Sequence, residues 1–432
     1  MRTSSGDSTA VQEASASPEH RSPGACRACG GALRHVFADL GMQPLANTYP
    51  CASDLGRAEL FYPLRAMVCE CCYLVQLAEC VSPEHIFSDY AYFSSYSDSW
   101  LEHARRYAAM AVDRFALDPQ SRVVEIGSND GYLLQHFHEQ DIPVLGIDPA
   151  ANVAAAAAAK GVPTVVKFFG EATARELAAD GRRADLLIGN NVLAHVPDLN
   201  DFVTGIGILL KPRGVVTLEF PHLLRLIEEH EFDTIYHEHF SYFSFATARR
   251  VFAAHGLRVF DVEELPTHGG SLRIYACHAD DEARPAGPLV TELLAREAAF
   301  GLGDLDTYLS FGERVKHTKR RLLEFLIDVK EQGKVVVGYG APAKGNTLLN
   351  YCGIRGDFLE ATFDRSPHKQ GRLLPGTHIP IYHPDRLAAM KPDYVLILPW
   401  NLREEIIAQL GHIRAWGGRF VTPVPEARVI AA

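Results

Sequence analysis

The sequence predicts an α/β protein with a doubly wound sheet at its centre, a small metal-stapled unit before it and a second α/β sheet after it. Seven of the nine cysteines lie within the first 80 residues. Strand-like and helix-like patterns alternate through the middle of the chain, and the last third repeats a strand followed by a glycine turn. At 432 residues, the chain is long enough for about two to four domains.

The composition is that of a folded, acidic protein. Hydrophobic residues make up 47% of the chain and charged residues 22%, which supplies packed cores. The 42 basic residues against 53 acidic ones give a net charge of −11, so we expect no nucleic-acid partner and no anionic membrane surface. No stretch approaches the roughly 18 apolar residues of a membrane span, and we expect a cytoplasmic protein. Residues 1–23 lack a hydrophobic period and are expected to be a disordered leader.

Two Cys-x-x-Cys pairs predict a zinc site in residues 24–90. The ligands are expected to be Cys26, Cys29, Cys69 and Cys72, with Cys71 as a spare thiol. Four thiolates leave no open coordination position, so the zinc is expected to be structural. The alternatives are a redox pair or free buried thiols.

The central block, assigned to residues 91–282, reads as alternating helices and strands. A helix is expected over 97–115 and from Gly131 onward, and another over the alanine-rich residues 150–160. Strands are expected over 122–126, 144–148, 185–188 and 214–218. Together they predict a parallel, doubly wound sheet.

A glycine turn after the first of these strands predicts a cofactor site. Gly127 lets the backbone approach a ligand at the carboxyl edge of the sheet. Asp148 ends the next strand, where a carboxylate can accept both hydroxyls of a ribose. The turn is not the dinucleotide Gly-x-Gly-x-x-Gly pattern. Asn190 and Asn191 follow a later strand, and their alternative role is turn chemistry only.

The third block, assigned to residues 283–432, begins after the turn-rich residues 280–288. Helices are expected over 289–300 and 305–332, and strands over 334–340, 358–364 and 394–398. The turn at Gly340 opens a helix whose N-terminal amides can receive a diphosphate, with Lys344 as counter-charge. The alternative is a glycine turn kept only for packing. Asp364 ends the next strand as Asp148 does in the central block, and could touch a ribose or base.

Residues 232–243 place a base, a carboxylate and a phenol close together. Tyr236, Glu238 and His239 can supply general acid/base groups with adjustable pKa values. The alternatives from spacing alone are an aromatic structural strand with solvated histidines, or a His-x-His metal site. The metalloprotease pattern His-Glu-x-x-His is absent.

Several segments, in order, resemble a known family. The turn Glu125-Ile126-Gly127-Ser128-Asn129-Asp130-Gly131 and the segment Leu209-Leu210-Lys211-Pro212-Arg213-Gly214 resemble class I S-adenosylmethionine-dependent methyltransferases. Together with Met42-Gln43-Pro44-Leu45-Ala46-Asn47, Tyr236-His237-Glu238-His239 and Gly338-Tyr339-Gly340-Ala341-Pro342-Ala343-Lys344, the chain from Cys26 onward resembles the zinc-containing sugar C-methyltransferases of deoxysugar biosynthesis.

The resemblance implies a class I methyltransferase domain, a C-terminal Rossmann-like domain that grips a nucleotide-sugar, and two cofactors, S-adenosylmethionine and structural Zn²⁺. It implies that His239 is the general base, that Glu238 orients it or tunes its pKa, and that Tyr236 contacts the sugar or the developing oxyanion. It also implies that His195 and Tyr90 belong to the active site, although Tyr92 competes with Tyr90 and each has a structural alternative. The remaining implied residues bind the methyl donor (Glu125, Gly127, Ser128, Asn129, Asp148, Asn190, Asn191) or the sugar nucleotide (Gly340, Lys344, Asn346).

The implied reaction transfers a methyl group to a ring carbon, C3, next to the ketone of a thymidine-diphosphate-linked 4-keto deoxysugar. A positioned histidine can remove the acidic α-proton, and the enolate carbon then attacks the sulfonium methyl. The implied enzyme is a monomer with a role in antibiotic deoxysugar biosynthesis. The alternatives are an NAD-dependent nucleotide-sugar oxidoreductase or epimerase, and a non-enzymatic zinc scaffold. Methylation at C5 and an amino group on the sugar stay open.

Overall fold

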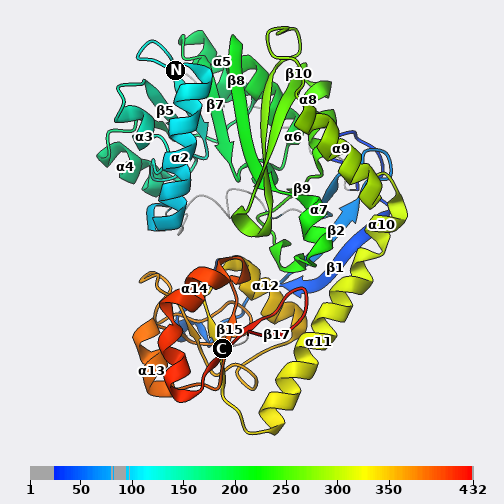
Figure 1. The fold of residues 1–432 in the computed structure, drawn as a ribbon, viewed down its shortest axis with the longest axis vertical. Coiled ribbons are helices and arrows are strands. Elements are labelled where there is room, and N and C mark those ends of the chain that lie inside the picture. The colour runs from blue at the N-terminus through cyan, green and yellow to red at the C-terminus, as the bar shows by residue number, and fades with distance from the viewer. Residues whose placement is uncertain (1–23, 79–80, 82–93, 97, 431–432) are drawn as a thin grey trace, which may run out of the picture.

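The computed structural model describes residues 24–78, 81, 94–96 and 98–430. The leader expected at 1–23 and the domain boundary expected at residue 90 lie outside these residues. Three sheets organise the described chain, of four, seven and six strands. Figure 1 shows the seven-stranded sheet above the six-stranded one, with the long helix α11 running down one side of the molecule.

The central sheet has the order β10-β11-β8-β7-β4-β5-β6. Its strands β4, β5 and β7 run parallel to one another, and β8 is parallel to β7. β11 runs antiparallel to both of its neighbours, which corrects the expected all-parallel sheet. The strands are β4 Val123–Ile126, β5 Val144–Ile147, β6 Thr164–Val165, β7 Ala184–Asn190, β8 Leu210–Pro221, β10 Leu257–Leu265 and β11 Ser271–His278.

Helices cover the two faces of this sheet, as the alternating pattern predicts (Figure 1). The alanine-rich stretch forms α4, which buries Val153, Ala154 and Ala157 on one face. The expected helix from Gly131 is shorter, because residues 131–134 form turns before it begins. These helices are α2 Asp98–Phe115, α3 Gln135–His138, α4 Ala151–Ala159, α5 Glu171–Ala179, α6 Leu199–Leu209, α8 Phe245–Ala254 and α9 Pro288–Phe300. The short helix α7 Leu223–Glu228 instead packs in the core shared with the module and the C-terminal sheet.

The four-cysteine module, defined here as residues 24–78, is built on a small antiparallel sheet of order β1-β2-β3-β9. Its own strands are β1 His35–Gln43, β2 Tyr62–Val68 and β3 Val75–Leu77. The fourth strand, β9 Ser241–Tyr242, comes from the middle of the chain, immediately after the Tyr-His-Glu-His segment. This strand therefore joins the candidate chemical segment to the cysteine module.

The C-terminal sheet has the order β14-β13-β12-β15-β16-β17, and its first five strands are parallel. The strand expected over 358–364 is reduced to two residues, and the helix expected over 305–332 is divided at Ser310. The elements are β12 Val336–Tyr339, β13 Thr362–Phe363, β14 Ile381–Tyr382, β15 Tyr394–Ile397, β16 Arg419–Thr422, β17 Arg428–Val429, α10 Leu305–Leu309, α11 Phe311–Glu331, α12 Ala343–Cys352, α13 Leu387–Met390 and α14 Arg403–Gln409.

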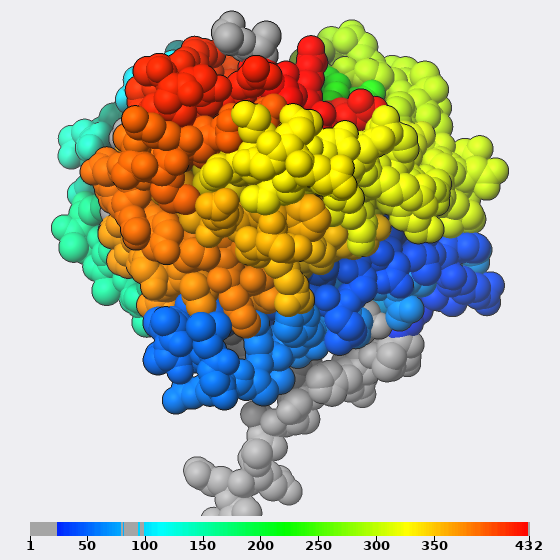
Figure 2. Space-filling view, turned by 90° about the horizontal axis from the view of Figure 1, so that it is seen from below, coloured from blue at the N-terminus to red at the C-terminus, as the bar shows by residue number. Residues whose placement is uncertain are grey.

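One hydrophobic core runs through the module, α11 and the C-terminal sheet. Helix α11 buries Val315, Leu322 and Leu326 at helical spacing, and its first residue, Phe311, stacks on Phe37 of β1 with ring centroids 4.5 Å apart. Figure 2 shows the same arrangement from below, with the blue module residues against yellow α11 and the orange C-terminal segment. The module is thus packed against the C-terminal sheet.

Within the described part of the chain, no helix is both long and apolar enough to cross a membrane.

Candidate active site and metal centre

A cavity of about 620 Å³ opens at the carboxyl edge of the central sheet. Parallel strands β4, β5 and β7 end together there, so the turns after them form one wall. Side chains of all three units line it: Asn47 from the module, Asp148 and His239 from the central block, and Lys344 from the start of α12. The cavity is therefore large enough for a cofactor beside a second molecule.

The glycine turn after β4 is part of this wall. Gly127 has a φ of +68°, and a Cβ there would lie 2.5 Å from Cγ2 of Val192, so only glycine fits. Asp148 follows β5, and its two carboxylate oxygens accept the backbone amides of Asn129 and Ala150, each at 2.9 Å. Each carboxylate oxygen keeps a free lone pair for a ligand hydroxyl. Burial raises the pKa of Asp148, while the bonds to these amides oppose the rise.

The other predicted cofactor residues divide into two groups. Asn129, Asn190 and Asn191 line the cavity, and both polar atoms of the buried Asn190 amide lack a protein partner, which leaves them free for a ligand. Glu125 and Ser128 lie behind the wall, fully buried, and are not among the described residues that line the cavity. Burial raises the pKa of Glu125 well above its ordinary value, the nearby Asp148 adds to this, and a hydrogen bond with Tyr132 opposes it.

Two hydrogen bonds fix the ring of His239. Its Nδ1 donates to the carbonyl of Thr234 at 2.9 Å, so its Nε2 carries the lone pair and accepts from the Tyr236 hydroxyl at 2.8 Å. This is the tautomer that a general base needs. Burial holds the pKa of His239 well below its ordinary value, and His195 lowers it further. The imidazole is therefore neutral at physiological pH.

His195 lies in the turn after β7 and borders the same cavity. Its ring centroid is 4.8 Å from that of His239. Burial lowers the pKa of His195 to about 4, and a hydrogen bond with the backbone of Glu238 opposes the shift. The sequence-predicted pair thus comes together although 44 positions separate the two residues in the chain.

Glu238 does not orient the His239 ring in the way we expected. That bond comes from the carbonyl of Thr234, and in the described chain no hydrogen bond joins the Glu238 carboxylate to His239. Both Glu238 oxygens instead accept from the amide of Asn47, at 2.7 and 2.9 Å. Burial raises the pKa of Glu238 to about 7, with the Asn47 bond and Lys369 opposing. Glu238 therefore borders the cavity with its carboxylate held by Asn47.

Lys344 enters the cavity at the first turn of α12, where the sequence predicts it. Its Nζ donates to Asn401 Oδ1 at 2.8 Å and lies 4.3 Å from the centroid of Trp400. Burial lowers the pKa of Lys344, while the carboxyl groups of Asp233 and Glu231 raise it. These two acids are themselves buried, which raises the pKa of Asp233 to about 6 and that of Glu231 to about 8.

Gly340 and Asn346 are not among the described residues that line the cavity. A Cβ on Gly340 would lie 2.4 Å from Cδ of Pro399, so packing requires a glycine here. Asn346 is buried and donates to the carbonyl of Ala46 at 2.6 Å. Asp364 accepts hydrogen bonds from the backbone amides of Ala341 and Ser366. Asp148 accepts two backbone amides in the same way after its own strand. Tyr90 and its competitor Tyr92 lie outside the described residues.

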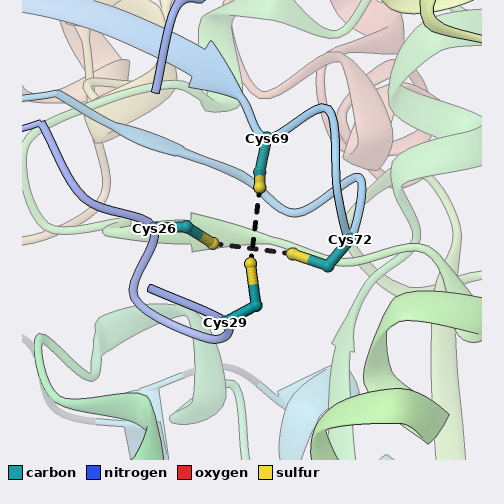
Figure 3. A group of neighbouring side chains, drawn as sticks. All are labelled: Cys26, Cys29, Cys69 and Cys72. Carbon is teal, nitrogen blue, oxygen red and sulfur yellow. Dashed lines mark hydrogen bonds between the residues drawn. The ribbon is translucent and has the colours of Figure 1, made fainter. Parts of the chain in front are cut away.

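The four predicted zinc ligands converge on one point, as Figure 3 shows. The sulfurs of Cys26, Cys29, Cys69 and Cys72 all lie within 4.8 Å of one another. The pairs Cys26–Cys72 and Cys29–Cys69 are 3.5 Å apart, close to the edge of about 3.8 Å that Zn–S bonds of about 2.3 Å give in a tetrahedron. A Cβ on Gly31 would lie 3.2 Å from the sulfur of Cys71 and 3.4 Å from that of Cys29. The cluster fits Zn²⁺, and no position is left for a substrate.

Sequence reasoning missed several cavity residues. Asn47 ends a motif that carries the family resemblance, so it could have been singled out; Lys369 and His268 have no comparable signal. His268 adopts a φ of +58° in a short turn before β11, and Trp100 packs edge-on against it. Only the tertiary structure brings these residues to the site.

Family comparison decides the class of the protein. The chain is 38% identical, over 94% of its length and 97% of the relative's, to the C-methyltransferase NovU of Streptomyces niveus. It belongs to the C-methyltransferase family. Three family models match in order along the chain. The first describes a zinc binding domain and matches residues 26–87, the second a methyltransferase domain at 100–262, and the third a C-methyltransferase C-terminal domain at 266–425.

More distant matches cover less of this C-methyltransferase. A ubiquinone biosynthesis O-methyltransferase of Rhizobium etli is 29% identical over 24% of the chain and 46% of its own length. Among solved structures, magnesium protoporphyrin IX methyltransferase of Synechocystis with bound S-adenosylhomocysteine covers 41% of the chain and 83% of its own, at 16% identity and a TM-score of 0.33. The PH0226 protein of Pyrococcus horikoshii gives a TM-score of 0.36 at 13% identity, covering 45% of the chain and 97% of its own.

These findings confirm an S-adenosylmethionine-dependent C-methyltransferase with a class I methyltransferase fold and a four-cysteine zinc site. The oxidoreductase and scaffold alternatives are therefore wrong.

Proposed function

We propose that the protein methylates C3 of a thymidine-diphosphate-linked 4-keto deoxysugar, with His239 as the base that removes the C3 proton. The observation that carries the proposal is the tautomer of His239: its Nδ1–H is held by Thr234, and its Nε2 lone pair faces the Tyr236 hydroxyl at the cavity. A neutral, buried imidazole in this state can accept a proton.

Tyr236 supplies the complementary group. Its hydroxyl donates to His239 Nε2 in the structure. When a ketone binds, the same proton can be donated to the ketone oxygen, which frees Nε2 and stabilises the negative charge that develops on that oxygen. The C3–H electrons form the enolate, and its carbon then bonds to the methyl group as the sulfur–methyl bond breaks.

The residues of the glycine-turn wall hold the methyl donor in this proposal. Asp148 accepts the ribose hydroxyls, and Gly127 lets the donor approach the backbone. The free amide atoms of Asn190 have no protein partner and are placed to bind the donor's polar groups. S-adenosylmethionine supplies the electrophilic methyl group. The chain orients it and excludes water.

The sugar nucleotide occupies the side of the cavity formed by the C-terminal domain. Lys344 stands at the N-terminus of α12, where amide dipoles and a cation favour a diphosphate. Lys369 lines the same side, donating to the carbonyl of Ala341 at 2.8 Å. Glu238 and His195 border the sugar end, together with Asn47. This local charge suits a nucleotide despite the net charge of −11.

Deuterium exchange separates the proton-transfer step from methyl transfer. The enzyme is incubated in D₂O with a thymidine-diphosphate 4-keto deoxysugar and S-adenosylhomocysteine, which cannot donate a methyl group. We expect wild type to incorporate deuterium at C3 and His239→Asn to be at least about 10²-fold slower, with unchanged binding of S-adenosylhomocysteine. Equal exchange in the two proteins would remove His239 from the role of base.

A further inference from the structure

Residues 236–242, here called the catalytic segment, end inside the sheet of the cysteine module. Strand β9 pairs with β3 through Tyr242 against Val75 and Ser241 against Gln76. Just before this pairing, the amide of Leu77 donates to the carbonyl of Phe240 at 3.0 Å. The backbone after His239 is therefore paired with the module.

Phe240, the residue after His239, is pinned at both of its backbone groups. Its amide donates to the carbonyl of Ala194 at 2.7 Å, next to His195. Its carbonyl accepts from Leu77 and also from Nη1 of Arg27, at 3.2 Å. The peptide that follows His239 is therefore bonded to the turn of His195 through the Phe240 amide and to the module through the Phe240 carbonyl.

Arg27 lies between the zinc ligands Cys26 and Cys29 in the chain, and its residue is only 7% exposed. The same Nη1 donates to the carbonyl of Leu77 at 2.8 Å, and the guanidinium carbon lies 5.7 Å from the centre of the Phe240 ring. Arg27 thus contacts the catalytic segment by one hydrogen bond, to the carbonyl of Phe240, and by packing on the Phe240 ring.

Gln76 ties this contact to the sulfur cluster. The backbone amide of Arg27 donates to Gln76 Oε1 at 2.9 Å, and Gln76 Nε2 donates to Cys26 Sγ at 3.1 Å. Gln76 is fully buried and is itself the residue of β3 that pairs with Ser241. Gln76 therefore links Cys26 and Arg27 through its side chain to β9, with which its backbone pairs. Zinc bound by four thiolates is an anionic cluster, which favours a buried cation beside it.

We propose that Arg27 is a positioning residue for the methyl-transfer reaction. It holds the peptide after His239 in a position that is set by the folded turn Cys26–Cys29 of the module. The cysteine module then does more than stabilise the fold: it sets the position of the base. The proposal rests on the proposed role of His239. A displacement of about 1 Å of a catalytic group can lower turnover by about 10²-fold, so a small shift of Phe240 is sufficient for a large effect.

The test compares Arg27→Met with Arg34→Met. Methionine keeps an unbranched apolar chain against Phe240 but removes the donors to Leu77 and Phe240. Arg34 belongs to the same module, its side chain is 69% exposed, and its ion pair with Glu70 is at the surface. Arg27→Lys, which keeps a charge and donors, serves as the conservative variant. Each protein is measured for zinc content, S-adenosylhomocysteine affinity, kcat, KM, and hydrogen exchange of the amides of Leu77 and of residues 236–242 without substrate.

We expect Arg27→Met to keep its zinc and its S-adenosylhomocysteine affinity within about twofold. Its kcat should fall by about 10²-fold with little change in KM for the methyl donor, and exchange at Phe240 and Leu77 should rise at least tenfold. Arg34→Met should match wild type in every readout, and Arg27→Lys should recover part of kcat and of the protection.

Two results overturn the proposal. Unchanged exchange and kcat in Arg27→Met would show that the module does not hold the base. Loss of zinc or failure to fold in both Arg27 variants would make Arg27 a folding determinant of the turn Cys26–Cys29 instead. Failure of the proposed function is separate: wild type would not methylate the 4-keto sugar, yet the exchange comparison, which needs no substrate, would still decide the positioning role.

Discussion

At the scale of single residues, the chemistry depends on which group holds which proton. Thr234 fixes the tautomer of His239 through its backbone carbonyl. A sequence motif of side chains cannot predict such a contact. The sequence predicts the cluster of Tyr236, Glu238 and His239 from residue type and spacing. It cannot predict that Glu238 turns to Asn47, because that pairing needs the module to fold against the central block.

Replacing Tyr236 by phenylalanine separates the two roles of the site. The change removes the proposed donor to the ketone oxygen but leaves the Nε2 lone pair of His239 intact. We expect kcat for methylation to fall by about 10²- to 10³-fold, with S-adenosylhomocysteine affinity unchanged by calorimetry. Wild-type kcat in Tyr236→Phe would exclude Tyr236 as the oxyanion donor.

The low pKa of His239 predicts an unusual pH profile. The base works when neutral and is lost when protonated, so lowering its pKa moves the acid limb of kcat/KM to lower pH. Glu238, whose pKa burial raises to about 7, could add a separate step to the profile, so the profile is measured in Glu238→Gln. We expect the acid limb of this variant to lie below that of an ordinary histidine, whereas a limb centred at about pH 6.5, the ordinary histidine value, would contradict a desolvated base.

At the scale of elements, apolar periodicity predicts the long helices and strands well, whereas it does not predict the short elements. Strands β4, β5 and β7 and helices α2, α4 and α9 lie where apolar periodicity places them. The antiparallel direction of β11 and the transfer of β9 to the module are set by long-range pairing, which local sequence does not encode. For the same reason the sequence did not predict that Lys369 and His268 line the cavity.

The glycine turn after β4 gives a matched pair of variants. Gly127→Ala places a Cβ 2.5 Å from Val192, whereas Gly181→Ala, at a φ of +71°, meets no atom within 4 Å. Both changes should cost about 1–2 kcal/mol of stability from the left-handed backbone. Only Gly127→Ala should also weaken S-adenosylhomocysteine binding, by tenfold or more in calorimetry. Equal affinity in the two variants would contradict a tight donor site at this turn.

At the scale of the whole molecule, the cavity is complete only when three units meet. The module supplies Asn47, the central block supplies His239, and α12 supplies Lys344. The continuous core from β1 through α11 to the C-terminal sheet holds these walls together. Sequence motifs predicted the three units and most of their chemistry, but their mutual packing required the structure.

The most direct test of the central claim locates the transferred methyl group. The enzyme is incubated with a thymidine-diphosphate 4-keto deoxysugar and S-adenosylmethionine labelled with ¹³C in its methyl group, and the product is studied by NMR. The account predicts a labelled methyl bonded to C3, correlated with the neighbouring ketone carbon, and loss of the C3 proton signal. A labelled methyl on oxygen, or no labelled sugar while the methyl donor binds, would contradict it.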